Sequence, residues 1–148
     1  MTKPMTKTDL WQRIEENFLR QGLLRTLQGE LTRVEVGFVD IRIPYAASLS
    51  QQHGYLHAAA TTAIADSACG YAALTTMPPG DEVLSVEFKV NLLAPAAGVA
   101  FTARARVIRG GRTLVVTAAD VFAHATVGDE GKLVATMLAT MIRLAAPQ

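Results

Sequence analysis

Residues 51–74 read QQHGYLHAAATTAIADSACGYAAL, a polar cluster followed by a long run of small and apolar side chains. From Ala58 to Leu74 this composition predicts a helix whose two faces are both buried. Asp66 is the one carboxylate inside the run. Because an unpaired carboxylate is costly to move out of water, its position here indicates a use for it. We expect Asp66 to take part in catalysis, with a structural hydrogen bond in an interface as the alternative.

The chain before this run predicts one helix and two strands. Apolar side chains recur at helical spacing over residues 10–18, with Thr8 as the expected N-cap and Gly22 as the stop. Between residues 30 and 44 the apolar period changes to two. That change predicts two strands joined by a turn near Gly37.

The chain after this run predicts strands only. Pro78-Pro79-Gly80 ends the helical region. Residues 85–92 alternate between polar and apolar side chains, as a half-buried strand does. Gly110-Gly111 suits a tight hairpin turn, and residues 128–131 mark another turn. The expected strands form a meander of four, at 85–92, 99–108, 113–122 and 133–144.

An antiparallel sheet needs an element that covers its apolar face, and the central helix is the only apolar helix in this sequence. We therefore predict a single α+β domain over residues 1–148. In it, a curved antiparallel sheet of five to six strands wraps around one long central helix, with a short N-terminal helix beside them. This arrangement is the hotdog fold.

The bulk composition excludes several classes of protein. A formal net charge of +1 gives no electrostatic footprint for nucleic acid or an anionic membrane surface. No apolar run reaches the roughly 18 to 20 residues that span a bilayer, and residues 1–8 lack the apolar core of a signal peptide. The single cysteine, Cys69, suits a reducing compartment and is expected to be a buried structural thiol. We expect a cytoplasmic protein without membrane or nucleic-acid partners.

The segment from Gln51 to Ala59, with Asp66 following it, resembles the active-site segment of the PaaI-type acyl-CoA thioesterases of the hotdog superfamily. That family has His-Gly-Gly at the start of the central helix, an acid further along it, and an Asn or Gln about fifteen residues before the acid. Residues 84–96 and the Arg-Gly-Gly-Arg run at 109–112 are also similar to the family's. The resemblance covers roughly residues 30 to 144.

One departure from the family pattern concerns the residues that follow His57. The family's two glycines are here Ala58 and Ala59. Alanine keeps the backbone N–H donors, but its Cβ narrows the approach of a ligand to the helix start. The two alanines leave the family's mechanism possible, but they change the shape of the slot that would bind the thioester.

The resemblance implies an acyl-CoA thioesterase that needs no cofactor and no metal. Asp66 would act as the general base or as the direct nucleophile. The unpaired N–H groups at the helix start, around Ala58 and Ala59, would form an oxyanion hole. Gln51 occupies the family's amide position, with Gln52 as the alternative, and would donate to the same oxygen or orient the water.

The remaining candidates surround the substrate. Ser85 matches a position where some relatives carry a hydroxyl that helps to hold the attacking water. His57 is expected mainly to shape the loop and the helix start, with a role as general base as the alternative. His53 and His124 are expected to be surface or supporting residues, since nothing has metal-ligand spacing. The residues expected to contact substrate or the CoA phosphates are His57, Gly54, Arg109, Gly110, Gly111 and Arg112. For the two arginines, solvated charges at the hairpin tip are the alternative.

Asp66 cannot reach the start of its own helix, because the nine residues from His57 correspond to roughly 13 Å of helix. Hotdog domains pair with their central helices side by side and antiparallel. The resemblance therefore implies a homodimer, or a dimer of dimers, in which the acid of one subunit faces the helix start of its partner.

Two other functions stay open at this stage. A hotdog hydratase or dehydratase acting on acyl-CoA would use His57 with an acid across the dimer. A non-catalytic acyl-CoA-binding hotdog protein would tolerate the loss of the two glycines, but it has no need of Gln51 and Asp66 together. The sequence leaves the acyl group undetermined.

Overall fold

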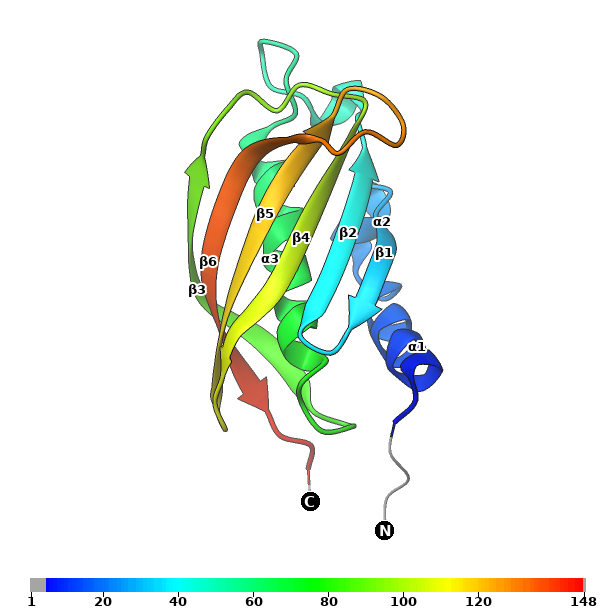
Figure 1. The fold of residues 1–148 in the computed structure, drawn as a ribbon, viewed down its shortest axis with the longest axis vertical. Coiled ribbons are helices and arrows are strands. Elements are labelled where there is room, and N and C mark those ends of the chain that lie inside the picture. The colour runs from blue at the N-terminus through cyan, green and yellow to red at the C-terminus, as the bar shows by residue number, and fades with distance from the viewer. Residues whose placement is uncertain (1–4, 148) are drawn as a thin grey trace.

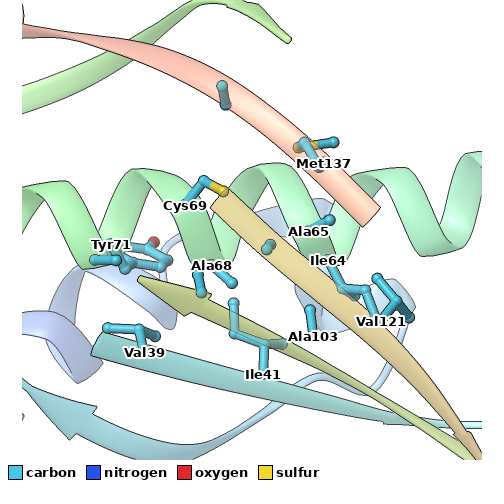
Figure 2. Packing of buried hydrophobic residues seen from close by; sticks show 14 of the residues in the cluster. Val39, Ile41, Ile64, Ala65, Ala68, Cys69, Tyr71, Ala103, Val121 and Met137 are labelled. Carbon is cyan, nitrogen blue, oxygen red and sulfur yellow. The ribbon is translucent and has the colours of Figure 1, made fainter. Parts of the chain in front are cut away.

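The central helix α3 spans Ala58–Leu74, the range that the sequence predicts. In the computed structural model, which describes residues 5–147, it lies across the inner face of an antiparallel sheet (Figure 1). Ile64, Ala65 and Cys69 are fully buried against the sheet, where they meet residues such as Val121 and Met137 (Figure 2).

The opposite side of α3 is only half-buried in the single chain, so the expectation that both faces are buried is wrong for one copy. Along this side every residue is small, except for the acid: Ala58, Thr62, Ala63, Asp66, Ser67 and Gly70. Among residues 5–147, no element packs over it completely. A helix this apolar thus has one covered face and one that is partly open.

The sheet has six strands in the order β1-β2-β4-β5-β6-β3, and all of its pairs are antiparallel. Together with the long helix across it, this confirms the predicted hotdog fold. Gly37, with a φ of 81°, forms the expected turn between the first two strands. The bounds are β1 Glu30–Glu35, β2 Phe38–Pro44, β3 Glu82–Leu92, β4 Ala100–Gly110, β5 Leu114–His124 and β6 Lys132–Leu144.

The predicted meander of four strands is wrong in one respect. β4, β5 and β6 are consecutive neighbours, but β3 pairs with β6 and not with β4. The physical reason is that β4 already has β2 and β5 on its two edges, so its backbone groups are paired. The chain leaving α3 therefore completes the sheet at the free edge of β6.

The tip of the hairpin between β4 and β5 also differs from the prediction. The Gly111 N–H donates to the carbonyl of Leu114 at 2.8 Å, so Arg112 and Thr113 occupy the tip in place of the two glycines. A Cβ at Gly111 would lie 2.6 Å from that same carbonyl oxygen. Close approach of the backbone is what requires glycine at position 111.

Two helices precede the sheet, where the sequence predicts one. α1 spans Lys7–Phe18 and α2 spans Gly22–Thr26, so Gly22 begins a second helix and is not only a stop. The N-cap is Thr6 and not Thr8. The Thr6 hydroxyl accepts from the Asp9 N–H at 3.1 Å, and the Asp9 carboxylate accepts from the Thr6 N–H at 2.9 Å. This reciprocal capping box fixes the helix start two residues earlier than predicted.

The turn that follows α3 is held from two sides. Arg13 of α1 donates to the carbonyl oxygens of Met77, Pro78 and Asp81. The Asp81 carboxylate pairs with Arg143 of β6, and this hydrogen bond lowers the pKa of Asp81 below its ordinary value. The end of the central helix is therefore tied to both the first helix and the last strand.

The loop between β2 and α3 contains a short 3-10 helix, Ala47–Leu49, and leads to the start of α3. Across residues 5–147, none of the helices combines the length and apolar character that crossing a membrane requires.

Candidate active site

Asp66 lies on the half-buried side of α3, facing β3. Ser85 of β3 donates its hydroxyl hydrogen to Asp66 Oδ1 at 2.6 Å. Within residues 5–147, Asp66 Oδ2 has no hydrogen-bond partner, so one carboxylate oxygen is held and the other is free. A carboxylate fixed in this way can accept a proton from a bound water or attack a carbonyl carbon.

A pocket of about 180 Å³ opens beside this pair, between α3, β3 and the junction of α1 with α2. Asp66 and Ser85 form one side of it. The residues that complete its wall include Asn17, Gln21, Ser67, Gly70 and Tyr71. The sequence therefore predicts the acid and the hydroxyl of this site, but not the polar residues opposite them.

Those polar residues form a chain of hydrogen bonds. The Gln21 side-chain amide donates to the Tyr71 hydroxyl at 2.7 Å, and that hydroxyl donates to Asn17 Oδ1 at 3.1 Å. Burial raises the pKa of Tyr71, so its hydroxyl stays protonated. Tyr71 itself is buried and lines this pocket. No periodic signal places Asn17 or Gln21 here, because Asn17 of α1 and Gln21, the N-cap of α2, lie about 50 residues before Tyr71 in sequence.

A second pocket, of about 500 Å³, lies at the start of α3. Gln51 and Ala58 line it, and Gln52 does not. Gln51 Oε1 accepts the backbone N–H of His53, which leaves the amide nitrogen of Gln51 available to a ligand. The far wall comes from residues 92–96, at the end of β3 and directly after it.

His57 is the N-cap of α3, and its ring nitrogen Nδ1 accepts the Ala59 N–H at 2.9 Å. One of the two amides expected in an oxyanion hole is therefore already used. The Ala58 N–H has no partner among the described residues, and Ala58 lines the pocket. The donor set at the helix start thus narrows to Ala58 and the side chain of Gln51, with His57 in a structural role.

The candidate substrate-binding residues lie elsewhere in the chain. Gly54 is exposed at a loop tip with a φ of 82°, and its carbonyl accepts the Tyr45 hydroxyl. Arg109, Gly110, Gly111 and Arg112 are exposed at the end of the sheet opposite to the start of α3 (Figure 1). None of these five lines either pocket described above. A single chain does not bring the four hairpin residues to Asp66 or to Ala58. Gly54 lies in the loop just before α3, where its N–H donates to the Gln51 carbonyl.

The two halves of the site are also separate from each other. Asp66 follows Ala58 on the same straight helix by about 12 Å of rise, and the two residues open into different pockets. Within one chain, the carboxylate and the amide cannot act on the same atom.

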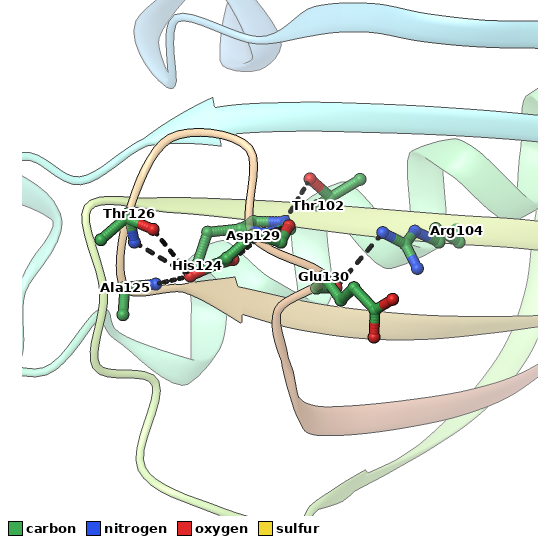
Figure 3. Close-up of polar contacts among 7 residues, drawn as sticks. All are labelled: Thr102, Arg104, His124, Ala125, Thr126, Asp129 and Glu130. Carbon is green, nitrogen blue, oxygen red and sulfur yellow. Dashed lines mark hydrogen bonds and ion pairs between the residues drawn. The ribbon is translucent and has the colours of Figure 1, made fainter.

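Cys69 and His124 can be assigned structural roles, and His53 cannot. Burial raises the pKa of Cys69 to about 12, so the thiol is not a nucleophile. His53 is exposed, as expected. His124 is buried and not on the surface: its ring lies between the Thr102 hydroxyl and the Asp129 carboxylate, each at 2.9 Å (Figure 3).

The Asp129 carboxylate also accepts the backbone N–H groups of Thr126 and Ala125. The bond from Thr126, followed by that from His124, lowers the pKa of Asp129. His124 and Asp129 thus hold the turn between β5 and β6 against β4. In the described part of the chain, no three His, Cys, Asp or Glu side chains group so as to hold a metal ion.

A sequence model described as the thioesterase superfamily matches residues 53–130. The 1,4-dihydroxy-2-naphthoyl-CoA hydrolase of Listeria monocytogenes is 28% identical over 95 residues, which is 64% of this chain and 77% of that protein. A Saccharolobus solfataricus protein provisionally named esterase SSO2140 is 32% identical over 104 residues, or 70% of this chain and 74% of that protein.

Two solved structures are similar over nearly the whole chain. A thioesterase family protein from Silicibacter pomeroyi has a TM-score of 0.88 and 42% identity, covering 93% of this chain and 99% of that one. The PaaI protein from the phenylacetic acid degradation operon of E. coli has a TM-score of 0.82, covering 93% and 94%. At 19% identity, the second comparison concerns the fold alone.

Proposed function

This chain belongs to the thioesterase superfamily and is a thioester hydrolase, and we propose that it hydrolyses an acyl-CoA to the free acid and coenzyme A. The observation that carries the proposal is the carboxylate of Asp66, half-buried at a pocket wall with one oxygen held by Ser85. The name of the Listeria relative, a hydrolase of an acyl-CoA, supports this class of substrate.

In the proposed reaction, Asp66 takes a proton from water as the water oxygen attacks the thioester carbonyl carbon. Direct attack by the carboxylate, followed by hydrolysis of the anhydride, is the alternative. The carbonyl oxygen becomes negative in the transition state, and the Ala58 N–H and the Gln51 amide of a second copy of the chain donate to it. A single donor of this kind often contributes roughly 3 kcal/mol. The carbon–sulfur bond then breaks, and the thiolate of coenzyme A leaves.

We propose that the complete site forms between two copies of the chain. The open side of α3 carries small side chains, which allow two helices to approach closely, and β3 is an edge strand with exposed Val86 and Phe88. Antiparallel pairing of two α3 helices would place Asp66 of each copy near Ala58 of its partner. It would also bring the Arg109–Arg112 hairpin of one copy toward the helix start of the other, where the arginines would meet CoA phosphates. Association of two such dimers stays a prediction.

The hydratase alternative is less well supported. A base at His57 would need a free lone pair on a ring nitrogen to take a proton. A neutral imidazole has only one such nitrogen, and here it is Nδ1, which already accepts the Ala59 N–H. In the proposed thioester hydrolysis, that hydrogen bond caps α3 and Asp66 is the catalytic residue.

The deciding experiment measures release of free thiol from a panel of acyl-CoA esters by the wild type, Asp66→Asn and Asp66→Ala. Loss of the base or nucleophile should lower kcat by at least about a hundredfold. Glu130→Gln removes a carboxylate from an exposed turn and serves as the matched control, with unchanged kcat expected. Thermal unfolding of each variant checks the fold. An Asp66→Ala enzyme with wild-type kcat would remove Asp66 from the mechanism.

A further inference from the structure

The far wall of the pocket at the start of α3 belongs mostly to an irregular loop, residues 93–99, which joins β3 to β4 and is here called the wall loop. Backbone hydrogen bonds hold this loop at both ends. The Leu93 N–H donates to the carbonyl of Val134 at 2.8 Å, and the Val99 N–H donates to the carbonyl of His124 at 2.7 Å. Because His124 and Val134 lie on the two sides of the turn between β5 and β6, the shape of that turn determines where the wall lies.

His124 lies at the end of β5, where the ladder of pairs with β6 has stopped. The last pair of that ladder is Ala123 with Lys132. Beyond it, the side chain of His124 makes the connection to the turn. Ring nitrogen Nδ1 lies 2.9 Å from Asp129 Oδ1 and 3.2 Å from the Asp129 carbonyl oxygen, and Nε2 lies 2.9 Å from the Thr102 hydroxyl (Figure 3).

The surroundings of the ring determine which nitrogen carries the hydrogen. The carboxylate and the carbonyl of Asp129 can only accept, so Nδ1 is the donor. In the neutral ring, Nε2 then has the lone pair and accepts the hydrogen of the Thr102 hydroxyl. One residue thereby ties three segments together: the turn through Asp129, β4 through Thr102, and the wall loop through its own backbone carbonyl.

Two glycines allow the wall loop and the turn to approach His124 this closely. A Cβ at Gly98 of the loop would lie 2.5 Å from the His124 carbonyl oxygen. A Cβ at Gly131 of the turn would lie 2.9 Å from ring atom Cε1. His124 is only 7% exposed. It therefore has little room to shift against either segment.

We propose that His124 is a positioning residue for the hydrolysis and holds the wall loop opposite Ala58. Thr102 and Asp129 keep its ring in place. This rests on the proposed function, in which the thioester carbonyl lies between the wall and the hydrogen-bond donors at the start of α3. His124 itself touches no substrate, because its ring is buried between β4 and the turn. It acts through the position of the wall loop.

A displaced wall weakens the fit of the substrate in the ground state and in the transition state alike, because Asp66 and the donors at the helix start are unchanged. We therefore expect His124→Leu to raise KM by about fivefold to tenfold and to change kcat by less than about twofold. A role in stability alone would lower the Tm and the fraction of folded enzyme. It would leave KM as in the wild type, because KM does not depend on the amount of active enzyme.

Thr102→Val is a milder change that still provides the test if His124→Leu does not fold. Valine has nearly the shape of threonine but lacks the hydroxyl, so Nε2 loses its partner and KM should rise in the same direction. Thr102→Ser keeps the hydroxyl and should keep the wild-type KM. Thr32→Val makes the same substitution on the exposed edge strand β1 and is the matched control.

Amide hydrogen exchange, read residue by residue by NMR, measures the position of the wall loop without catalysis. The Val99 N–H, which bonds to the His124 carbonyl, should exchange at least about tenfold faster in Thr102→Val than in the wild type. The Ala119 N–H, in the middle of β5, should keep its wild-type rate.

Wild-type KM in both His124→Leu and Thr102→Val would overturn the positioning role, whatever their Tm, and so would a wild-type exchange rate at Val99. A raised KM that Thr102→Ser does not show would support it. Absence of hydrolysis of every acyl-CoA by the wild type would instead overturn the proposed function. The exchange rate of Val99 would then still show whether the ring holds the wall loop.

Discussion

At the scale of single residues, the main finding is how Asp66 is held. Asp66 stands out in the sequence because placing a carboxylate in an apolar helix costs free energy. The structure adds that it is half-buried, bonded through one oxygen to Ser85, and free at the other. A bound carboxylate oxygen restricts the side chain to one orientation, and that is what a base or nucleophile requires.

This arrangement predicts a graded effect at Ser85. Ser85→Ala removes a hydrogen bond to a charged group, so kcat should fall by about tenfold to a hundredfold, less than for Asp66→Ala. Ser85→Thr keeps the hydroxyl and should retain most of the activity. Steady-state kinetics on one acyl-CoA measure both, with Ser48→Ala on an exposed loop as the control. Equal activity of the alanine and threonine variants would show that the hydroxyl is not needed.

The sequence predicts some of the candidate site residues and misses others for a physical reason. Asp66 and His57 belong to the central helix, so local pattern is enough to identify them. Gln21, the N-cap of α2, reaches the pocket of Asp66 from outside that helix and donates a hydrogen bond to Tyr71. Its sequence neighbours resemble those of any polar helix junction. Contacts of this kind follow from packing and leave no periodic signal.

At the scale of elements, the prediction with the strongest local pattern, the central helix, is confirmed. The prediction of which strands pair across a long separation in sequence is not confirmed. The central helix has the predicted range because its run of small residues begins after a capping His and ends before a proline turn. The pairing of β3 with β6 was missed, because the free edge of a sheet is known only once the other strands are placed. The helix start at Thr6 was missed because Thr8 looks equally able to cap.

The capping box of α1 gives a direct comparison of those two threonines. Thr6→Ala removes the side chain that accepts the Asp9 N–H, and it should lower the free energy of unfolding by about 1 kcal/mol. Thr8→Ala changes an exposed position inside the helix and should have almost no effect. Urea unfolding of both variants measures the difference. The opposite order would mean that the helix begins at Thr8 in solution.

The pair between Asp81 and Arg143 predicts how stability depends on pH. Because the folded-state pKa of Asp81 is lowered, its stabilisation is present above the unfolded value of about 3.9 and is lost as pH falls through the folded value. Asp81→Asn should therefore lower the Tm at neutral pH and flatten the dependence of Tm on pH below about 4. Glu16→Gln on exposed α1 is the control. A variant that matches the wild type at neutral pH but still loses stability as steeply in acid would contradict the assignment.

At the scale of the whole molecule, the proposed pairing of two half-sites would make the subunit arrangement part of the mechanism. If the acid and the amides act across an interface, then two different inactive variants can restore each other. In a mixed dimer of Asp66→Ala with Gln51→Ala, one site carries both defects and the other carries neither. The mixture should therefore regain activity that neither variant has alone.

The expected level after random exchange of subunits is about a quarter of the wild-type sites, because about half of the dimers are mixed and each has one intact site. Mixing after partial denaturation and refolding, followed by a kcat measurement, tests this. Two Asp66 variants mixed in the same way should regain nothing. Sites contained within one chain would also give no recovery in the first mixture, and that result would contradict the composite site.

The distance of about 12 Å between Asp66 and Ala58 along one rigid helix has a consequence for how such an enzyme responds to its own abundance. Under the proposed pairing, dilution below the dissociation constant of the dimer silences catalysis by mass action while each chain keeps its fold. In that regime the reaction rate rises with the square of the protein concentration. Gene dosage then sets the reaction rate more steeply than it would for a monomeric catalyst.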